Sequence, residues 1–186
     1  MSFLGKRLLE HNITHLTNAG FRTVVIIANQ EDKQIVESIH IENTKIHIVI
    51  QKQPHGMGDA LLSARNDINN QACLVVNAED VVAETLYTKL IVEARKGNAF
   101  VVGKRVQTYQ DLGYLRFDKD RLIEVVEKPG KGNEPSDLVN LVFHFFPDIS
   151  VFFKLLEREV SDRDDVYEKA LSIYMQNVVT QVIPYD

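Results

Sequence analysis

Short apolar runs alternate with amphipathic stretches along the first hundred residues, and this alternation limits the folds open to the chain. Residues 23–28 (TVVIIA) and 72–76 (ACLVV) are continuously apolar, as strands buried on both faces are. Residues 86–94 instead space their apolar side chains three and four apart, which is typical of a helix. Strands that alternate with helices predict an α/β fold with a mostly parallel central sheet and helices on both faces.

The pattern changes after Val106. Residues 113–117 (GYLRF) and 121–126 (RLIEVV) flank a polar turn and predict a β-hairpin inserted into the α/β pattern. Residues 138–146 (LVNLVFHFF) predict a further strand, and Asp148 is placed to cap the helix that follows. We find no repeat, low-complexity segment or linker, so we expect residues 1–186 to form a single domain.

Composition argues against several classes of function. The net charge is −5 with no basic tail, which argues against nucleic acid as a main partner. No apolar run is long enough to cross a membrane and the first residues do not resemble a signal peptide, so we expect a cytoplasmic protein with no membrane partner. Cys73 is the only cysteine, which rules out an intrachain disulfide and a cysteine-rich zinc site.

Polar residues follow the predicted parallel strands, and α/β folds place ligands at such strand ends. The strand predicted at 45–50 is followed by Gln51, a break at residues 54–56 (PHG), and Gly56-Met57-Gly58 before a helix. The amide of Gln51 can donate and accept, which suits the edge of a base. Glycines would let a ligand approach the unpaired N–H groups of the helix start. By itself, this stretch fits an ordinary strand-to-helix turn better than a binding loop.

Two neighbouring carboxylates, Glu79 and Asp80, follow the buried run at 72–76. Mg²⁺ takes hard oxygen ligands and usually one or two protein carboxylates, so this pair is a candidate Mg²⁺ site. The same pair also fits a solvated acidic strand end or the cap of the next helix.

Three segments resemble, in their order and spacing, the sugar-1-phosphate nucleotidyltransferases, which join a nucleoside triphosphate to a sugar phosphate. They are QKQPHGMGDA at 51–60, LVVNAED at 74–80, and DLGYLRF, RLIEVVEKP and NLVFHFF within 111–146. The resemblance implies a Rossmann-like three-layer sandwich with a mostly parallel sheet and a hairpin insertion. It implies that Gln51, Gly56, Met57 and Gly58 bind the nucleotide, that Glu79 and Asp80 bind Mg²⁺, and that Gly113, Glu127, Lys128 and Asn140 bind the sugar phosphate.

The last group of residues also has ordinary explanations. Glu127 and Lys128 could form a surface ion pair, and Gly113 could only mark the entry to the hairpin. Asn140 lies in an apolar strand, where its buried amide needs partners that neighbouring backbone could supply as well as a sugar hydroxyl. We assign no role to His144, because a lone histidine in an apolar strand is most often a packed or surface residue.

The chain departs from the family pattern in its phosphate-binding parts. The family begins with a strand and a Gly-x-Gly-Thr-Arg loop that cradles the triphosphate, and these 186 residues contain no such segment. Met57 stands where the family has threonine, and Ala78-Glu79 stands where it has Gly-Asp. We therefore expect a nucleotidyltransferase-like domain truncated at both ends and inactive or nearly so by itself. The alternative is a complete, non-catalytic subunit that senses a ligand or binds a partner.

The missing first strand has a structural consequence as well. In the family it lies inside the sheet; if the chain is complete, we expect residues 23–28 and 72–76 either to pair with each other or to expose unpaired edges. Exposed edges invite association, which leaves a homo-oligomer open.

Overall fold

The computed structural model describes residues 2–3, 6–52, 55–159 and 165–186, and the chain divides into two compact units. Unit 1 comprises Met1–Asn69 and Ala78–Lys96, and unit 2 comprises Asn70–Asn77 and Gly97–Asp186. Each unit is described by itself below.

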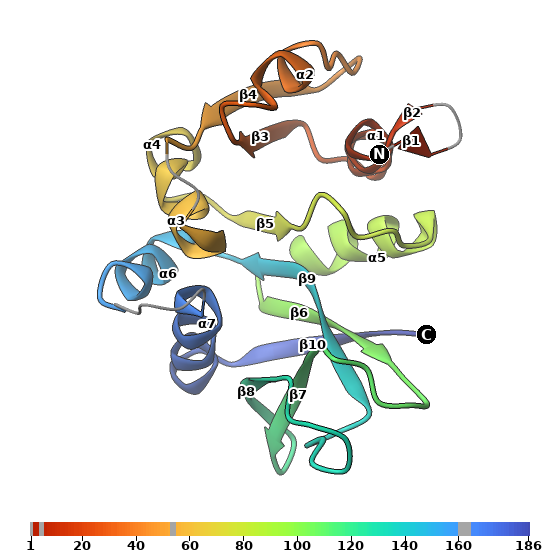
Figure 1. Cartoon of the computed structure of the whole chain (residues 1–186), viewed down its shortest axis with the longest axis vertical. Coiled ribbons are helices and arrows are strands. Elements are labelled where there is room, and N and C mark those ends of the chain that lie inside the picture. Colours follow the sequence, from red (N-terminus) through yellow and green to blue (C-terminus); the bar gives the residue numbers. More distant parts are fainter. Residues whose placement is uncertain (1, 4–5, 53–54, 160–164) are drawn as a thin grey trace. The chain divides into compact units, whose positions relative to one another are not determined.

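Unit 1 contains a parallel pair of strands with helices around it (Figure 1). β3 (Thr23–Ala28) pairs with β4 (Lys45–Ile50) in the register Thr23↔Lys45 to Ala28↔Ile50. Both strands have the bounds that the apolar runs predict. The apolar core of unit 1 is formed by residues of the helices at 8–19 and 33–37, of β3, and of the segment just after the second helix. They are Ile13, Ile26, Val36 and Ile39. The remaining elements of unit 1 are β1 (Ser2–Phe3), β2 (Lys6–Arg7), α1 (Leu8–Ala19), α2 (Lys33–Glu37), α3 (Gly56–Ser63), α4 (Arg65–Ile68) and α5 (Glu84–Ala94).

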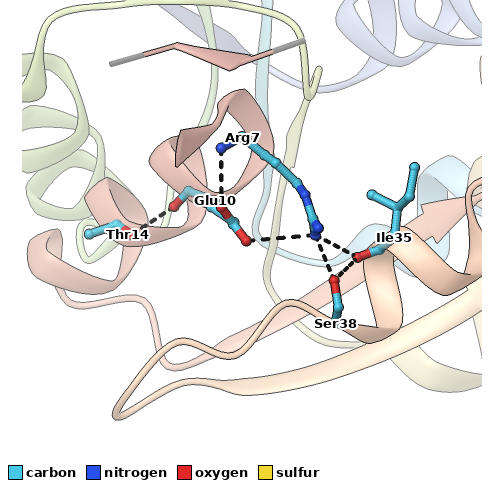
Figure 2. Close-up of polar contacts among 5 residues, drawn as sticks. All are labelled: Arg7, Glu10, Thr14, Ile35 and Ser38. Atoms are coloured by element: carbon cyan, nitrogen blue, oxygen red, sulfur yellow. Dashed lines mark hydrogen bonds and ion pairs between the residues drawn. The ribbon is translucent and has the colours of Figure 1, made fainter. Parts of the chain in front are cut away.

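Arg7 joins the start of α1 to the end of α2 (Figure 2). Its backbone N–H donates to Oε2 of Glu10 (3.1 Å), which satisfies a group at the helix start. Its guanidinium donates to the carbonyl of Ile35 (3.0 Å) and to Oγ of Ser38 (2.6 Å). A cation at the carboxyl end of a helix is favourable because the last carbonyls carry partial negative charge. Helix α1 begins at Leu8, directly after Arg7, which is its N-cap residue.

Unit 2 is built on a six-stranded mixed sheet (Figure 1). The strand order is β10-β6-β9-β7-β8, and β5 pairs with the C-terminal half of β9. The hairpin is confirmed, because β7 pairs antiparallel with β8 and Asp118 lies opposite Arg121 across a two-residue turn. The elements of unit 2 are β5 (Cys73–Val76), β6 (Ala99–Arg105), β7 (Gly113–Asp118), β8 (Arg121–Glu127), β9 (Leu138–Phe146), α6 (Ile149–Leu156), α7 (Val166–Asn177) and β10 (Thr180–Tyr185).

The direction of the strands differs in part from the expectation. Parallel pairing is found between β3 and β4 and between β10 and β6. β9 runs antiparallel to each of its neighbours β5, β6 and β7, so the larger sheet is mixed and not mostly parallel. The reason is that β9 follows the hairpin without a helical crossover, and a parallel return requires such a crossover.

Aromatic side chains fill the space between the sheet of unit 2 and its helices. Phe146 of β9 stacks on Phe152 of α6, with ring centroids 4.4 Å apart, and Tyr167 and Tyr174 of α7 meet Phe152 edge-on. Asp148 caps α6 as predicted, since its Oδ1 accepts from the backbone N–H of Ser150 (2.9 Å). Buried aromatic rings of this size dominate the energy of a small core.

The α/β, Rossmann-like class is confirmed by this arrangement and by the structural relatives reported below. In the part of the chain that the structure describes, no helix has both the length and the apolar character needed to cross a bilayer.

Candidate functional site

In unit 1, Gln51 follows β4 directly and is held at two points. Its backbone N–H donates to the carbonyl of Ala28 (2.8 Å), which extends the β3–β4 ladder by one residue. The residue is 9% exposed, and its Nε2 donates to Oδ2 of Asp59 at 2.5 Å. The second amide hydrogen and the carbonyl oxygen remain the groups with which Gln51 could read a base.

The predicted loop residues Gly56, Met57 and Gly58 form the first turn of α3. Gly56 has φ +85°, a left-handed conformation that glycine adopts without strain. Gly58 is buried, and Asp59 lies in the same first turn, where a negative charge is favoured by the helix dipole. Of the predicted break, Pro54 lies outside the described residues. The contact with Asp59 therefore joins Gln51 to the start of α3. The sequence analysis did not single out Asp59, although an acid directly after Gly-x-Gly was a visible signal.

Glu79 and Asp80 lie in a segment whose backbone is fixed by Asn12 of α1. Nδ2 of Asn12 donates to the carbonyls of Ala78 (2.9 Å) and Asp80 (3.1 Å). The hydroxyl of Tyr87 in α5 donates to Oδ1 of Asn12 at 3.0 Å. Asn12 is 4% exposed and sits on the apolar face of α1, four residues after Leu8 and four before Leu16. A polar residue on an apolar face was the signal that the sequence reasoning passed over.

The two acidic side chains differ in exposure: Glu79 is exposed and Asp80 is half-buried. Among the described residues, no three His, Cys, Asp or Glu side chains form a group able to hold a metal by themselves. Two adjacent carboxylates nevertheless match the donor set of Mg²⁺, which usually completes its shell with phosphate and water. The prediction of Mg²⁺ at Glu79 and Asp80 stays a prediction.

In unit 2, Gly113 and Glu127 lie opposite each other at the open end of the β7–β8 hairpin. A Cβ on Gly113 would overlap with Oε1 of Glu127 and would lie 2.7 Å from Cγ1 of Val125. The carboxylate of Glu127 therefore folds back over the glycine, although the residue as a whole is exposed. Loss of surrounding water raises the pKa of Glu127 above its ordinary value, and the neighbouring Lys128 acts in the opposite direction.

Lys128 leaves β8 in an unusual backbone conformation, with φ +43°. Its N–H donates to the carbonyl of Leu112 (3.2 Å), and its Nζ lies 4.0 Å from Oδ2 of Asp111. Asp111 also accepts from the hydroxyl of Tyr109 (3.0 Å). A left-handed conformation at a non-glycine residue is strained and persists only where surrounding structure holds it, which is often at a functional site.

Asn140 lies in β9, and its Oδ1 is 3.0 Å from Nε2 of His144. Nδ1 of His144 is in turn 2.9 Å from the hydroxyl of Tyr167 in α7. The sequence reasoning gave His144 no role and expected a packed or surface residue; the structure buries it, 1% exposed, in contact with a candidate ligand residue. Burial lowers the pKa of His144 to about 3, while the backbone carbonyl of Leu141 acts in the opposite direction, so the imidazole is neutral at pH 7.

The comparisons with known proteins place this arrangement in a family. The sequence profile of the family described as "Nucleotidyl transferase" matches residues 1–183. The chain therefore belongs to the nucleotidyl transferase family. This confirms the resemblance drawn from the three sequence segments.

Among curated proteins, the chain is similar to the bifunctional protein GlmU of Methanococcus maripaludis, with 31% identity over 137 residues. That match covers 73% of this chain and 31% of the relative. The chain is also 31% identical over 151 residues to the UTP–glucose-1-phosphate uridylyltransferase of Bacillus subtilis. This match covers 76% of the chain and 51% of that protein. The chain thus spans about a third of the length of the GlmU proteins it matches and about half of the uridylyltransferase.

Among solved structures, apo UDP-glucose pyrophosphorylase superposes with a TM-score of 0.82 at 16% identity, covering 100% of this chain and 81% of that one. UDP-glucose pyrophosphorylase in complex with UDP-glucose superposes with a TM-score of 0.79 at 15% identity, covering 98% and 80%. At such low identity these likenesses establish the fold alone.

Proposed function

We propose that this chain is the nucleotidyltransferase-like domain of a sugar-1-phosphate nucleotidyltransferase. The overall reaction joins a nucleoside triphosphate to a sugar 1-phosphate and gives a nucleoside diphosphate sugar and pyrophosphate. A phosphate oxygen of the sugar phosphate attacks the α-phosphorus, and the bond from that phosphorus to the pyrophosphate oxygen breaks. Such chemistry consists mainly of positioning the reactants and neutralising charge.

The observation that carries the proposal is the carboxylate of Glu127 held over Gly113 beside the strained Lys128. In the proposed site, the carboxylate accepts hydrogen bonds from sugar hydroxyls, and the Lys128 ammonium faces the phosphate as a point charge. Asn140 supplies amide hydrogen bonds to the same ligand. A glycine opposite Glu127 keeps space that any side chain would fill.

For the nucleotide, Gln51 offers the remaining hydrogen-bonding groups of its amide to a base edge, and Gly56 to Gly58 allow close approach at the start of α3. If Mg²⁺ takes part, Glu79 and Asp80 are the residues that would hold it, and it would neutralise phosphate charge. Asn12 keeps the backbone of that segment in place through its bonds to the Ala78 and Asp80 carbonyls.

The names of the relatives suggest which ligands to test first. A UTP–glucose-1-phosphate uridylyltransferase and a UDP-glucose pyrophosphorylase are among the proteins this chain resembles. We therefore propose UTP and glucose 1-phosphate as the leading candidate pair.

We expect the 186 residues by themselves to bind these ligands but to turn them over slowly. They contain no Gly-x-Gly-Thr-Arg segment to stabilise charge at the phosphorus. Loss of one such stabilising group typically lowers the rate by about 10²–10³-fold.

Isothermal titration of the chain with UTP and with glucose 1-phosphate tests the proposal. We expect Asn140→Ala and Glu127→Ala to weaken sugar phosphate binding about tenfold and leave UTP unaffected, because each removes contacts to one ligand only. Gln51→Ala should do the reverse. The proposal would be contradicted if the chain bound neither ligand and also bound no other nucleotide or sugar phosphate. An assay of pyrophosphate release tests the expected lack of turnover.

A further inference from the structure

Three polar side chains form a chain of hydrogen bonds that begins in the aromatic core of unit 2. The Tyr167 hydroxyl lies 2.9 Å from Nδ1 of His144, and Nε2 of His144 lies 3.0 Å from Oδ1 of Asn140. Tyr167 and His144 are 2% and 1% exposed, while Asn140 is half-buried. Polar groups cost free energy in such surroundings unless they are paired, and here each one is paired with the next.

A bulge in β9 makes the contact between Asn140 and His144 possible. Val101 of β6 lies opposite His144, yet the next residue, Val102, lies opposite Leu141. Val142 and Phe143 are therefore extra residues on β9 relative to β6. In a regular strand, residues four apart are separated by about 13 Å at roughly 3.3 Å per residue, too far for these side chains to meet. Bulges of this kind redirect side chains and occur often beside active sites.

The direction of the hydrogen bonds follows from the acceptor on Asn140. The imidazole faces two acceptors, Oδ1 of Asn140 and the backbone carbonyl of Leu141; because Oδ1 can only accept, we infer that the hydrogen of the neutral imidazole is on Nε2. Nδ1 then carries a lone pair, and the Tyr167 hydroxyl donates to it. The amide oxygen of Asn140 is thereby turned toward the histidine, and its NH₂ group is left facing the other way.

We propose that His144 and Tyr167 are positioning residues that fix the orientation of the Asn140 amide, so that it presents its N–H donors to an oxygen of the bound sugar phosphate. This inference rests on the proposed function, since it takes Asn140 as a ligand of the sugar phosphate. Without the histidine, the amide can turn over and offer an acceptor where the ligand needs a donor.

The substitution Tyr167→Phe tests this with the least disturbance, because it removes one hydroxyl and keeps the ring that packs edge-on against Phe152. Tyr174→Phe is the matched control: Tyr174 lies on the same helix, is equally buried, and also packs edge-on against Phe152. His144→Phe removes the contact to Asn140 directly. Each variant is titrated with glucose 1-phosphate and with UTP, and its unfolding midpoint is recorded.

We expect His144→Phe to weaken glucose 1-phosphate binding about 5- to 10-fold and Tyr167→Phe about 2- to 5-fold, as loss of one hydrogen bond does. UTP binding should not change, and Tyr174→Phe should bind both ligands as the wild type does. Nitrogen-15 spectra of the wild-type protein should show that the ring of His144 is neutral and protonated at Nε2. The signal of the Asn140 side-chain NH₂ should shift on addition of glucose 1-phosphate.

The outcomes separate this inference from the proposed function. If Asn140→Ala loses glucose 1-phosphate binding while Tyr167→Phe and folded His144→Phe bind normally, the positioning role is wrong and the sugar phosphate site stands. If His144 of the wild type is protonated at Nδ1, the positioning role is overturned in the same way. If Asn140→Ala binds as the wild type does, the assignment of Asn140 to the site fails, and the positioning role fails with it.

Discussion

The carboxylate of Glu127 lies over the Cα of Gly113, its partner across the β7–β8 ladder. The missing side chain of the glycine creates the space that the acid occupies. A glycine at the open end of the β7–β8 hairpin therefore determines where the carboxylate of Glu127, a proposed ligand-binding residue, lies.

Substitution of Gly113 by alanine should displace Glu127. The new Cβ would overlap with the carboxylate and crowd Val125, which we expect to lower the free energy of unfolding by about 1–3 kcal/mol. Glucose 1-phosphate binding should fall at least tenfold, because the carboxylate moves. Urea unfolding and titration measure the two effects. Gly132→Ala is the control for binding: its φ of +88° makes the substitution strained, so it should also lose stability, but a Cβ there meets no atom within 4 Å and glucose 1-phosphate binding should be kept. Binding as tight in Gly113→Ala as in the wild type would contradict the argument.

Replacement of Lys128 separates its charge from its backbone conformation. Lys128→Gly removes the ammonium and the left-handed strain together, whereas Lys128→Ala removes only the ammonium. We expect Lys128→Gly to be more stable than Lys128→Ala by about 1 kcal/mol. Both should bind glucose 1-phosphate equally weakly. The exposed pair with Asp111 contributes little to stability, so a large loss of stability in Lys128→Gly would refute this account.

Asp59 should affect nucleotide binding through Gln51. Asp59→Ala removes the acceptor of the Gln51 amide, and we expect about 3- to 10-fold weaker UTP binding, as for the loss of a hydrogen bond. Asp59→Asn keeps an acceptor oxygen and should lose less. Glucose 1-phosphate binding serves as the internal control. Equal UTP affinity in Asp59→Ala and the wild type would show that Gln51 needs no such support.

Asn12 should control the segment that carries the two acids. Asn12→Asp removes the donor to the Ala78 and Asp80 carbonyls while keeping size, so we expect a loss of about 1–3 kcal/mol in unfolding free energy. Mg²⁺ affinity, measured by titration in the presence of UTP, should fall as well. Tyr87→Phe, which removes the bond to Oδ1 of Asn12 and leaves the Asn12 donor in place, should have a smaller effect on both. Unchanged Mg²⁺ affinity in Asn12→Asp would argue against metal binding at Glu79 and Asp80.

The buried His144 predicts a dependence of stability on pH. Its pKa is lowered to about 3 in the folded chain from 6.5, so the unfolded chain binds the proton more readily. The stabilisation is complete above pH 6.5 and is lost as the pH falls from there toward 3, by at most about 5 kcal/mol in total. We expect unfolding curves of the wild type and His144→Phe to converge over this range. A constant difference between them would show that the imidazole is already protonated or exposed.

Much of the fold could be predicted because its strands are marked by strong local signals. TVVIIA, KIHIVI and LVNLVFHFF have strand bounds that match their apolar runs. The direction of β9 could not be predicted, because it depends on a connection without a helix. Neither could the bulge at Val142, since two extra residues leave no trace in an apolar run.

The candidate site was predictable only in part, for a related reason. Gln51, Gly113, Glu127 and Asn140 stand in recognisable segments, but the residues that hold them are distant in sequence or look like core. His144 and Tyr167 are 23 residues apart, and Asn12 contacts a segment 66 residues away. Only the folded structure reveals such pairs.

The two extra residues of β9 also fix how long this strand can be. Side chains alternate between the faces of a strand, so loss of a single residue between Asn140 and His144 would turn every side chain before it to the opposite face. Loss of both would restore a one-to-one ladder but remove the bend that brings the amide to the imidazole. Sequence length between these two positions is therefore as strict a requirement of the proposed site as the identity of either residue, and related chains with a gap here should lack the contact.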